Sequence, residues 1–360
     1  MGSYVDQFER KVCEYTGARY AAACVNGTAS LHIALLTAGV EPGDEVLVPS
    51  LTFIATVNAV RYVNADPIFL GSDSFFTLDP QIVLDFLNTY TNFKNGVCIN
   101  RQTGKRISAI VPVHVLGNAA DLGTVLEACS ERNISIIEDA AESLGTFYTS
   151  GPLAPAHTGT LGHVGIYSFN GNKIITSGGG GMVVTNDPEL ARRARYLTNQ
   201  AKEPGEQYVH EEVGYNYRLT NIQAALGLAQ LEVLPEFIEC KRRTYRAYQE
   251  AVDPISGLEV AAQPDFASNN SWMTAIRVDA SVYGLDAFEL MKKLAERNIQ
   301  TRPLWVPNHL QKPYRTCQTF GVDASEQSWQ EVLNLPCSAD LSDQQQQRVI
   351  EELRDVGQQR

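Results

Sequence analysis

A single lysine, Lys173, lies in a stretch whose composition suits covalent chemistry. It follows a short apolar run, Val164 to Phe169, and precedes a four-glycine tract at 178–181, which leads into a β-like run at 182–185. A lysine beside packed backbone is poorly solvated, and this favours the neutral amine that attacks a carbonyl and forms a Schiff base. The glycines let the main chain turn tightly or approach a ligand closely. Taken alone, the stretch also fits a β-turn with an exposed lysine.

The second candidate is the acidic segment 138–143, which follows a predicted buried strand at 134–137. Acids at the carboxyl end of a parallel strand lie at the mouth of an α/β sheet, where ligands bind. One carboxylate there can keep a ring nitrogen protonated, and Asp139 is the candidate. Its alternative role is to cap a helix. A lone histidine, His114, lies near the end of another predicted strand at 109–115. Its position favours a structural role over a catalytic one.

An anion site is the third candidate. A β-like run at 20–25 leads into a small-residue turn at 26–30 and then a predicted helix at 31–38. Free backbone N–H groups and the helix dipole both favour a phosphate at such a helix N-terminus. Asn26 or Thr28 could instead serve only as an ordinary helix cap.

Two further segments offer aromatic surfaces. Phe53 lies near the start of a helix predicted within 49–60, where its ring could cover a planar ligand or belong to the core. Arg302 and Trp305 combine a guanidinium suited to phosphate with an aromatic surface. Their segment also fits an edge strand.

The long polar connection at 199–221 is richer in large side chains than solubility requires. It contains Tyr215, Asn216 and Arg218 close together. Tyrosine and arginine are enriched where proteins meet, so this segment suits a shared pocket or a subunit interface.

Alternating strand and helix patterns up to Leu197 predict a mostly parallel sheet covered by helices on both faces. The first strand is not followed by G-x-G-x-x-G, which gives a dinucleotide-binding fold little support. A helical connector interrupted at Pro235 leads to a smaller α+β region. We therefore predict an α/β chain with a large domain at 1–235 and a small C-terminal domain at 236–360.

Composition narrows the possible partners. The 360 residues carry a formal net charge of −12, which argues against a broad nucleic-acid surface or an anionic membrane as partner. Seven scattered cysteines without a C-x-x-C pair indicate buried thiols in a reducing cytoplasm. No apolar run is long enough for a membrane helix, and we expect no metal site.

Together these residues resemble the sugar aminotransferases of the DegT/StrS family, which are fold type I pyridoxal-phosphate enzymes. The resemblance covers nearly the whole chain. It rests on six segments that occur in the family's order: Asn26 to Ala29, Pro49 to Val60, Glu138 to Ser143, Ser168 to Met182, Gly214 to Leu219 and Thr301 to Trp305.

The resemblance implies a role for each candidate. Lys173 holds pyridoxal 5'-phosphate and then acts as the proton-transfer base, while Asp139 pairs with the pyridinium nitrogen. Cofactor contacts fall to Gly27, Thr28, Ala29 and Ser168 at the phosphate, Phe53 stacked on the ring, and Glu142 beside it. Asn216 reaches the phosphate of the neighbouring subunit, which makes a homodimer the smallest complete unit. Substrate contacts fall to Tyr215, Arg218, Arg302 and Trp305.

The implied reaction moves an amino group from glutamate to C4 of a nucleotide-linked 4-keto-6-deoxy sugar used in surface polysaccharides. The segment 168–173 together with Gly180 is most similar to the branch that aminates UDP-4-keto-6-deoxy-N-acetylglucosamine. Many relatives that form perosamine from GDP-4-keto-6-deoxymannose carry an acid within the glycine tract, which this chain lacks.

Other members of the family mark two further alternatives. A sugar dehydratase of this family has histidine in place of the lysine, whereas Lys173 is present here. A regulatory protein that binds the cofactor without catalysis remains a separate reading. Family members also carry some tens of residues before the equivalent of Tyr4. Because this sequence opens at Met1, we expect it to lack that segment, which helps to close the sugar site.

Overall fold

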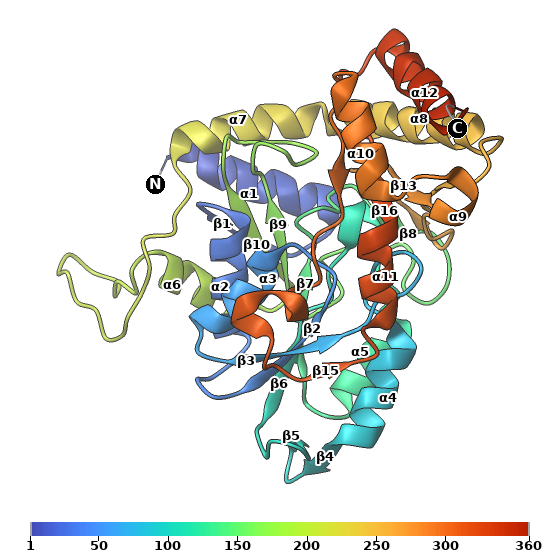
Figure 1. The fold of residues 1–360 in the computed structure, drawn as a ribbon. Helices are drawn as coiled ribbons and strands as arrows, with labels where there is room; N and C mark the ends of the chain where they lie inside the picture. The colour runs from blue at the N-terminus through green and yellow to red at the C-terminus, as the bar shows by residue number, and fades with distance from the viewer. Residues whose placement is uncertain (1, 359–360) are drawn as a thin grey trace.

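The computed structural model describes residues 2–358, so the expectation about the start of the chain at Met1 lies outside the described residues. Eight strands form the central sheet (Figure 1). Their order is β1 (Tyr20–Cys24), β10 (Gly181–Thr185), β9 (Val164–Ser168), β7 (Ser135–Asp139), β6 (Ile107–Ile110), β2 (Glu45–Pro49), β3 (Asp66–Leu70) and β15 (Thr319–Phe320). β10 runs opposite to the other seven strands of this sheet, which confirms a mostly parallel sheet.

Helices cover both faces of this sheet. Successive residues of β1 alternate between two apolar clusters: Ala21 and Ala23 belong to one, Ala22 and Cys24 to the other. The cluster of Ala22 includes α2 (Gly27–Thr37), α3 (Ile54–Tyr62) and α6 (Pro188–Thr198). The opposite face carries α1 (Ser3–Thr16), α7 (Asn221–Glu232), α4 (Pro80–Tyr90) and α5 (Gly123–Ser130).

The C-terminal region builds a second, smaller antiparallel sheet. Its order is β11 (Leu258–Val260), β13 (Ala275–Val278), β16 (Val332–Asn334) and β14 (Arg302–Pro303). The surrounding helices are α8 (Leu234–Val252), α9 (Ala280–Tyr283), α10 (Ala287–Glu296), α11 (Asp323–Glu331) and α12 (Asp343–Gln358). Strand β14 is at the edge of this sheet, so the edge-strand interpretation of Arg302 is confirmed.

Short elements connect these layers. They are the hairpin β4 (Thr91–Lys94) and β5 (Val97–Asn100), the pair β8 (Phe147–Tyr148) and β12 (Ala267–Ser268), and the 3-10 turns η1 (Val115–Gly117), η2 (Asn308–Leu310) and η3 (Lys312–Tyr314). The strand predicted at 109–115 ends early because β6 stops before Pro112 and the chain turns into η1. Proline lacks the N–H that a central strand requires.

The C-terminal chain also returns to the first sheet. Strand β15 pairs in parallel with β3, and the Asn308 N–H donates to the Ser50 carbonyl at 2.8 Å. A separate apolar core lies within 248–356. The division at residue 235 therefore stays a prediction.

Four of the seven cysteines are buried, three are half-buried, and all are free thiols. Within residues 2–358 no helix is both long and apolar enough to cross a membrane. The same residues contain no cluster of three or more His, Cys, Asp or Glu side chains arranged to hold a metal ion.

Candidate active site

The carboxyl edge of the central sheet opens into a cavity of about 660 Å³. Strand pairing explains why distant segments meet there. Gly181 lies opposite both Cys24 and Ser168, and Asp139 lies opposite Ile166, so β1, β9 and β7 end together. The cavity wall includes nine of the predicted site residues: Gly27, Thr28, Phe53, Asp139, Glu142, Ser168, Lys173, Arg302 and Trp305.

Lys173 is directed into this cavity, so the interpretation as an exposed turn lysine is wrong. Its side chain is 13% exposed, and Nζ lies 3.3 Å from Glu142 Oε1. The amine also lies over the Trp272 indole, 4.3 Å from the ring centroid. The tract that follows needs glycine, because φ is +144° at Gly179 and +147° at Gly180.

Asp139 is the buried acid of the cavity. Its carboxylate accepts the Thr56 hydroxyl at 2.7 Å and the Ala141 N–H at 3.1 Å. Burial raises the pKa of Asp139, while the bond from Thr56 and the charge of Lys173 oppose that rise. Turns rather than a helix follow it at 140–146, so Asp139 caps no helix.

Glu142 shares this environment. It is buried, and one carboxylate oxygen accepts the Leu116 N–H at 2.9 Å while the other faces Lys173. Burial raises the pKa of Glu142 and the neighbouring lysine charge lowers it. Two acids therefore approach the cavity, but only Glu142 contacts the amine directly.

The N-terminus of α2 forms another part of the wall. Asn26 caps the helix by accepting the Ala29 N–H at 2.7 Å, so the capping interpretation of Asn26 is confirmed. Gly27 and Thr28 lie in the first turn, where no intrahelical carbonyl can accept their N–H groups. A Cβ at Gly27 would lie 2.8 Å from Ser168 Cβ, so glycine keeps this contact open. Ala29 is buried and does not line the cavity.

Besides Ala29, three predicted residues in one polar segment do not line this chain's cavity. The middle of the segment between α6 and α7 is exposed at 204–213 and extends away from the body (Figure 1). The end of the segment returns to the body, where Tyr215 packs against His32 and Tyr217, with ring centroids 4.7 and 5.1 Å away. The backbone of Asn216 forms an isolated antiparallel β-bridge with Asn199, and that of Arg218 forms one with Cys24. The role of Asn216 toward a neighbouring subunit stays a prediction, as do the substrate contacts of Tyr215 and Arg218.

Sequence reasoning missed several residues of the wall. Thr56 and Trp272 are the most direct, because they contact Asp139 and Lys173. Asn170, Asn172, Met273 and Asn334 also line the cavity. The position of Thr56 near the start of α3 was an available signal. Trp272 gave none, since nothing in the local pattern connects it with a lysine ninety-nine positions earlier (272 − 173).

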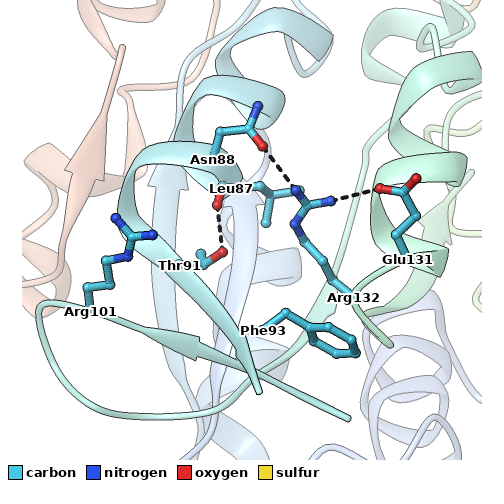
Figure 2. A pocket seen from close by; sticks show the side chains of 7 residues that line it. All are labelled: Leu87, Asn88, Thr91, Phe93, Arg101, Glu131 and Arg132. Carbon is cyan, nitrogen blue, oxygen red and sulfur yellow. Dashed lines mark hydrogen bonds and ion pairs between the residues drawn. The ribbon is translucent and has the colours of Figure 1, made fainter. Parts of the chain in front are cut away.

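A second hollow, of about 350 Å³, lies beside α4, the β4–β5 hairpin and the end of α5 (Figure 2). Its two arginines already have partners. Arg132 donates to Asn88 at 2.9 Å and to Glu131 at 3.3 Å, and Arg101 donates to the Thr89 carbonyl at 3.1 Å. None of the predicted site residues lines it. The lysine cavity is therefore the candidate active site.

Comparison with known proteins agrees with this site. Residues 1–354 match the DegT/DnrJ/EryC1/StrS aminotransferase family. The chain is 36% identical to Bacillus subtilis EpsN, whose name describes a pyridoxal phosphate-dependent aminotransferase, over 98% of this chain and 88% of that protein. It is also 36% identical to the GDP-perosamine synthase of Caulobacter vibrioides, over 99% of this chain and 91% of that enzyme.

A solved structure confirms the fold. The crystal structure of a DegT/DnrJ/EryC1/StrS aminotransferase from Brucella abortus matches with a TM-score of 0.89 at 30% identity, covering 100% of this chain and 91% of that one. The two sheets thus form the expected fold type I arrangement. The chain belongs to the DegT/DnrJ/EryC1/StrS family and is a pyridoxal-phosphate-dependent sugar aminotransferase.

Proposed function

We propose that the enzyme moves an amino group from glutamate to C4 of a nucleotide-linked 4-keto-6-deoxy sugar, and that the sugar is UDP-4-keto-6-deoxy-N-acetylglucosamine. The observation that carries the proposal is the shared cavity of Lys173 and Asp139, a largely buried amine and a buried carboxyl. The choice of UDP rests on the segment 168–173 and on the absence of an acid in the glycine tract.

The residues of the cavity fit the cofactor. The α2 N-terminus offers unpaired N–H groups at Gly27 and Thr28, and the Thr28 and Ser168 hydroxyls join the same wall, which suits a phosphate. Asp139 supplies a carboxylate for a protonated ring nitrogen. Phe53 lines the wall with a half-exposed ring that would cover the ring of the cofactor.

Each residue has a separate task in the transfer. When bound, pyridoxal phosphate supplies an aldehyde that condenses with amines and a ring that withdraws electrons from the bond being broken. Lys173 Nζ would bind that aldehyde at rest and then take the proton from Cα of the amino donor. Glu142 holds Nζ in place by a contact of 3.3 Å, and the lysine side chain is only 13% exposed.

The part of the site that binds the sugar substrate would include residues from the C-terminal region and from a second subunit. Arg302 and Trp305 line the cavity from the C-terminal region and would contact the substrate. We assign Tyr215, Asn216 and Arg218 to the cavity of a partner subunit in a homodimer, because none of the three lines the cavity of its own chain. The unpaired thiols favour a reducing cytoplasm for this enzyme.

A GDP-linked substrate is the second candidate, favoured by the 36% identity to a GDP-perosamine synthase. Turnover of UDP-4-keto-6-deoxy-N-acetylglucosamine and GDP-4-keto-6-deoxymannose, each with glutamate, decides between them. We expect the UDP sugar to have the higher kcat/KM. A preference for the GDP sugar would reverse the assignment.

Lys173→Ala tests the catalytic role itself. We expect it to lower turnover about a thousandfold or more, because it removes both the attachment point and the proton-transfer base. Turnover near the wild-type rate would contradict the role of Lys173. A wild-type cofactor absorbance that glutamate leaves unchanged would instead support a regulatory protein without catalysis.

A further inference from the structure

The Lys173 amine is held from two sides by groups that prefer a positive charge. Glu142 Oε1 lies 3.3 Å from Nζ, and the Trp272 ring centroid lies 4.3 Å from it. Both residues are buried, at 5% and 3% exposure. A carboxylate and an aromatic face attract an ammonium much more strongly than a neutral amine, above all in a desolvated site.

The tryptophan is fixed in this position by its own hydrogen bonds. Its indole N–H donates to the Asn172 carbonyl at 2.8 Å, and its backbone N–H donates to Asn270 Oδ1 at 2.9 Å. The buried Lys241 amine donates to its carbonyl at 3.0 Å. Asn270 also donates to the Glu142 carbonyl at 2.9 Å, so one amide connects the segments of Glu142 and Trp272. Glu142 and Trp272 thus form a preorganised pair.

We propose that Glu142 and Trp272 form a docking site for the Lys173 ammonium while its amine is free of the cofactor. The inference rests on the proposed role of Lys173. In that role the amine alternates between covalent attachment and a free state, and the free amine becomes an ammonium once it has taken the proton from Cα of the amino donor. The free ammonium needs a site that stabilises it and keeps it within reach of the reacting carbon. Trp272 is a positioning residue because it acts through Lys173.

The test measures an equilibrium rather than a rate. The holoenzyme is titrated with glutamate at a fixed 2-oxoglutarate concentration. Cofactor absorbance reports how much lysine is free of the cofactor, and it gives the ratio of glutamate to 2-oxoglutarate at which half of the lysine is free. Trp272→Leu removes the aromatic face, so we expect this ratio to rise about tenfold. Trp272→Phe keeps a weaker aromatic face but loses the indole N–H, and we expect a rise of about threefold.

A matched control uses a tryptophan elsewhere in the molecule. Trp329 packs against Phe288, with ring centroids 6.0 Å apart, and does not line the cavity. Trp329→Leu should leave the ratio at the wild-type value. Borohydride reduction at one matched ratio gives a second measurement, in which Trp272→Leu should retain more cofactor on Lys173 than the wild type.

The outcomes separate this inference from the proposed function. An unchanged ratio in Trp272→Leu would overturn the docking site, as would equal shifts in the Leu and Phe variants, because those would trace to the indole hydrogen bond. If borohydride fixes no cofactor on Lys173 of the wild type, the proposed role of the lysine fails first. Thermal unfolding of each holoenzyme shows whether the variants remain folded.

Discussion

Two neighbouring acids at the end of β7 have opposite surroundings. Glu138 is completely buried and receives four hydrogen bonds, from His114 Nε2 at 3.0 Å and from the N–H groups of Gly159 at 2.7 Å, Leu161 at 2.6 Å and Gly162 at 2.6 Å. Successive residues of a strand point to opposite faces, and Asp139 is the one that lines the cavity. Among the described residues its carboxylate accepts from Thr56 and Ala141 only.

The two carboxyls therefore differ in proton affinity. Burial raises the pKa of Glu138, but the bonds from His114, Gly162 and Gly159 outweigh it and leave the pKa below its ordinary value. At Asp139 burial dominates and the pKa is raised. An acid whose hydrogen bonds are complete supports the fold, whereas an acid with remaining acceptor capacity beside a cavity is available to a ligand.

The largest effect should come from Asp139→Asn. The variant keeps the shape of the side chain but removes the charge that would hold a protonated ring nitrogen, so kcat/KM should fall about a thousandfold. Steady-state turnover of the keto sugar with glutamate measures this loss.

The fold should tolerate the same change. Because the pKa of Asp139 is raised, its ionised form costs stability as pH rises through that pKa. Cofactor-free Asp139→Asn should therefore unfold at pH 7 with a free energy no lower than wild type. A large loss of stability would place Asp139 with Glu138 as a structural acid and break the comparison.

Glu138→Gln should have the opposite result. Glutamine offers one acceptor oxygen, and its NH2 group would face donors that the carboxylate now accepts. Breaking such a buried network should lower the free energy of unfolding by about 3 kcal/mol. Denaturant unfolding of the cofactor-free protein measures it, and a stability equal to that of wild type would contradict the structural role.

The dependence of stability on pH should differ between wild type and Glu138→Gln, and its direction follows from the pKa of Glu138. The pKa of Glu138 is lowered in the folded protein, so its contribution is present above the ordinary carboxyl pKa and is lost as pH falls through the folded value. Wild type should lose stability steeply in acid, and Glu138→Gln should lose less over the same range. Parallel curves for the two proteins would mean that Glu138 does not govern acid unfolding.

The sequence was sufficient to predict the sheet, because alternating apolar runs identify strands and glycines identify the turns between them. It also indicated that His114 is structural, which its bond to Glu138 confirms. The choice of Asp139 over Glu138 came from the family resemblance, because local spacing alone does not show which acid of a neighbouring pair faces the cavity. That depends on the register of β7 against β9, which is set by contacts between residues far apart in the chain.

Site residues that come from distant segments of the chain were equally difficult to predict from the sequence. Trp272 begins a segment, 272–278, whose alternating pattern predicts only a strand. Its proximity to Lys173 arises from the packing of the C-terminal region on the first sheet. Tyr215 and Arg218 were predicted from the family pattern, yet a single chain does not bring them to its own cavity. Sites assembled across lobes or subunits cannot be read from local spacing.

The smallest effect should come from Thr56, and it tests how finely Asp139 is tuned. Thr56→Val keeps the volume and removes the hydroxyl that donates to Asp139 at 2.7 Å. Since that bond lowers the pKa of Asp139, its loss raises the pKa further and weakens the anionic form, costing about 1 kcal/mol or fivefold in kcat/KM at pH 7. Thr56→Ser should restore the rate. If the Val and Ser variants behave alike, Thr56 contributes packing rather than a hydrogen bond, and its hydroxyl does not tune Asp139.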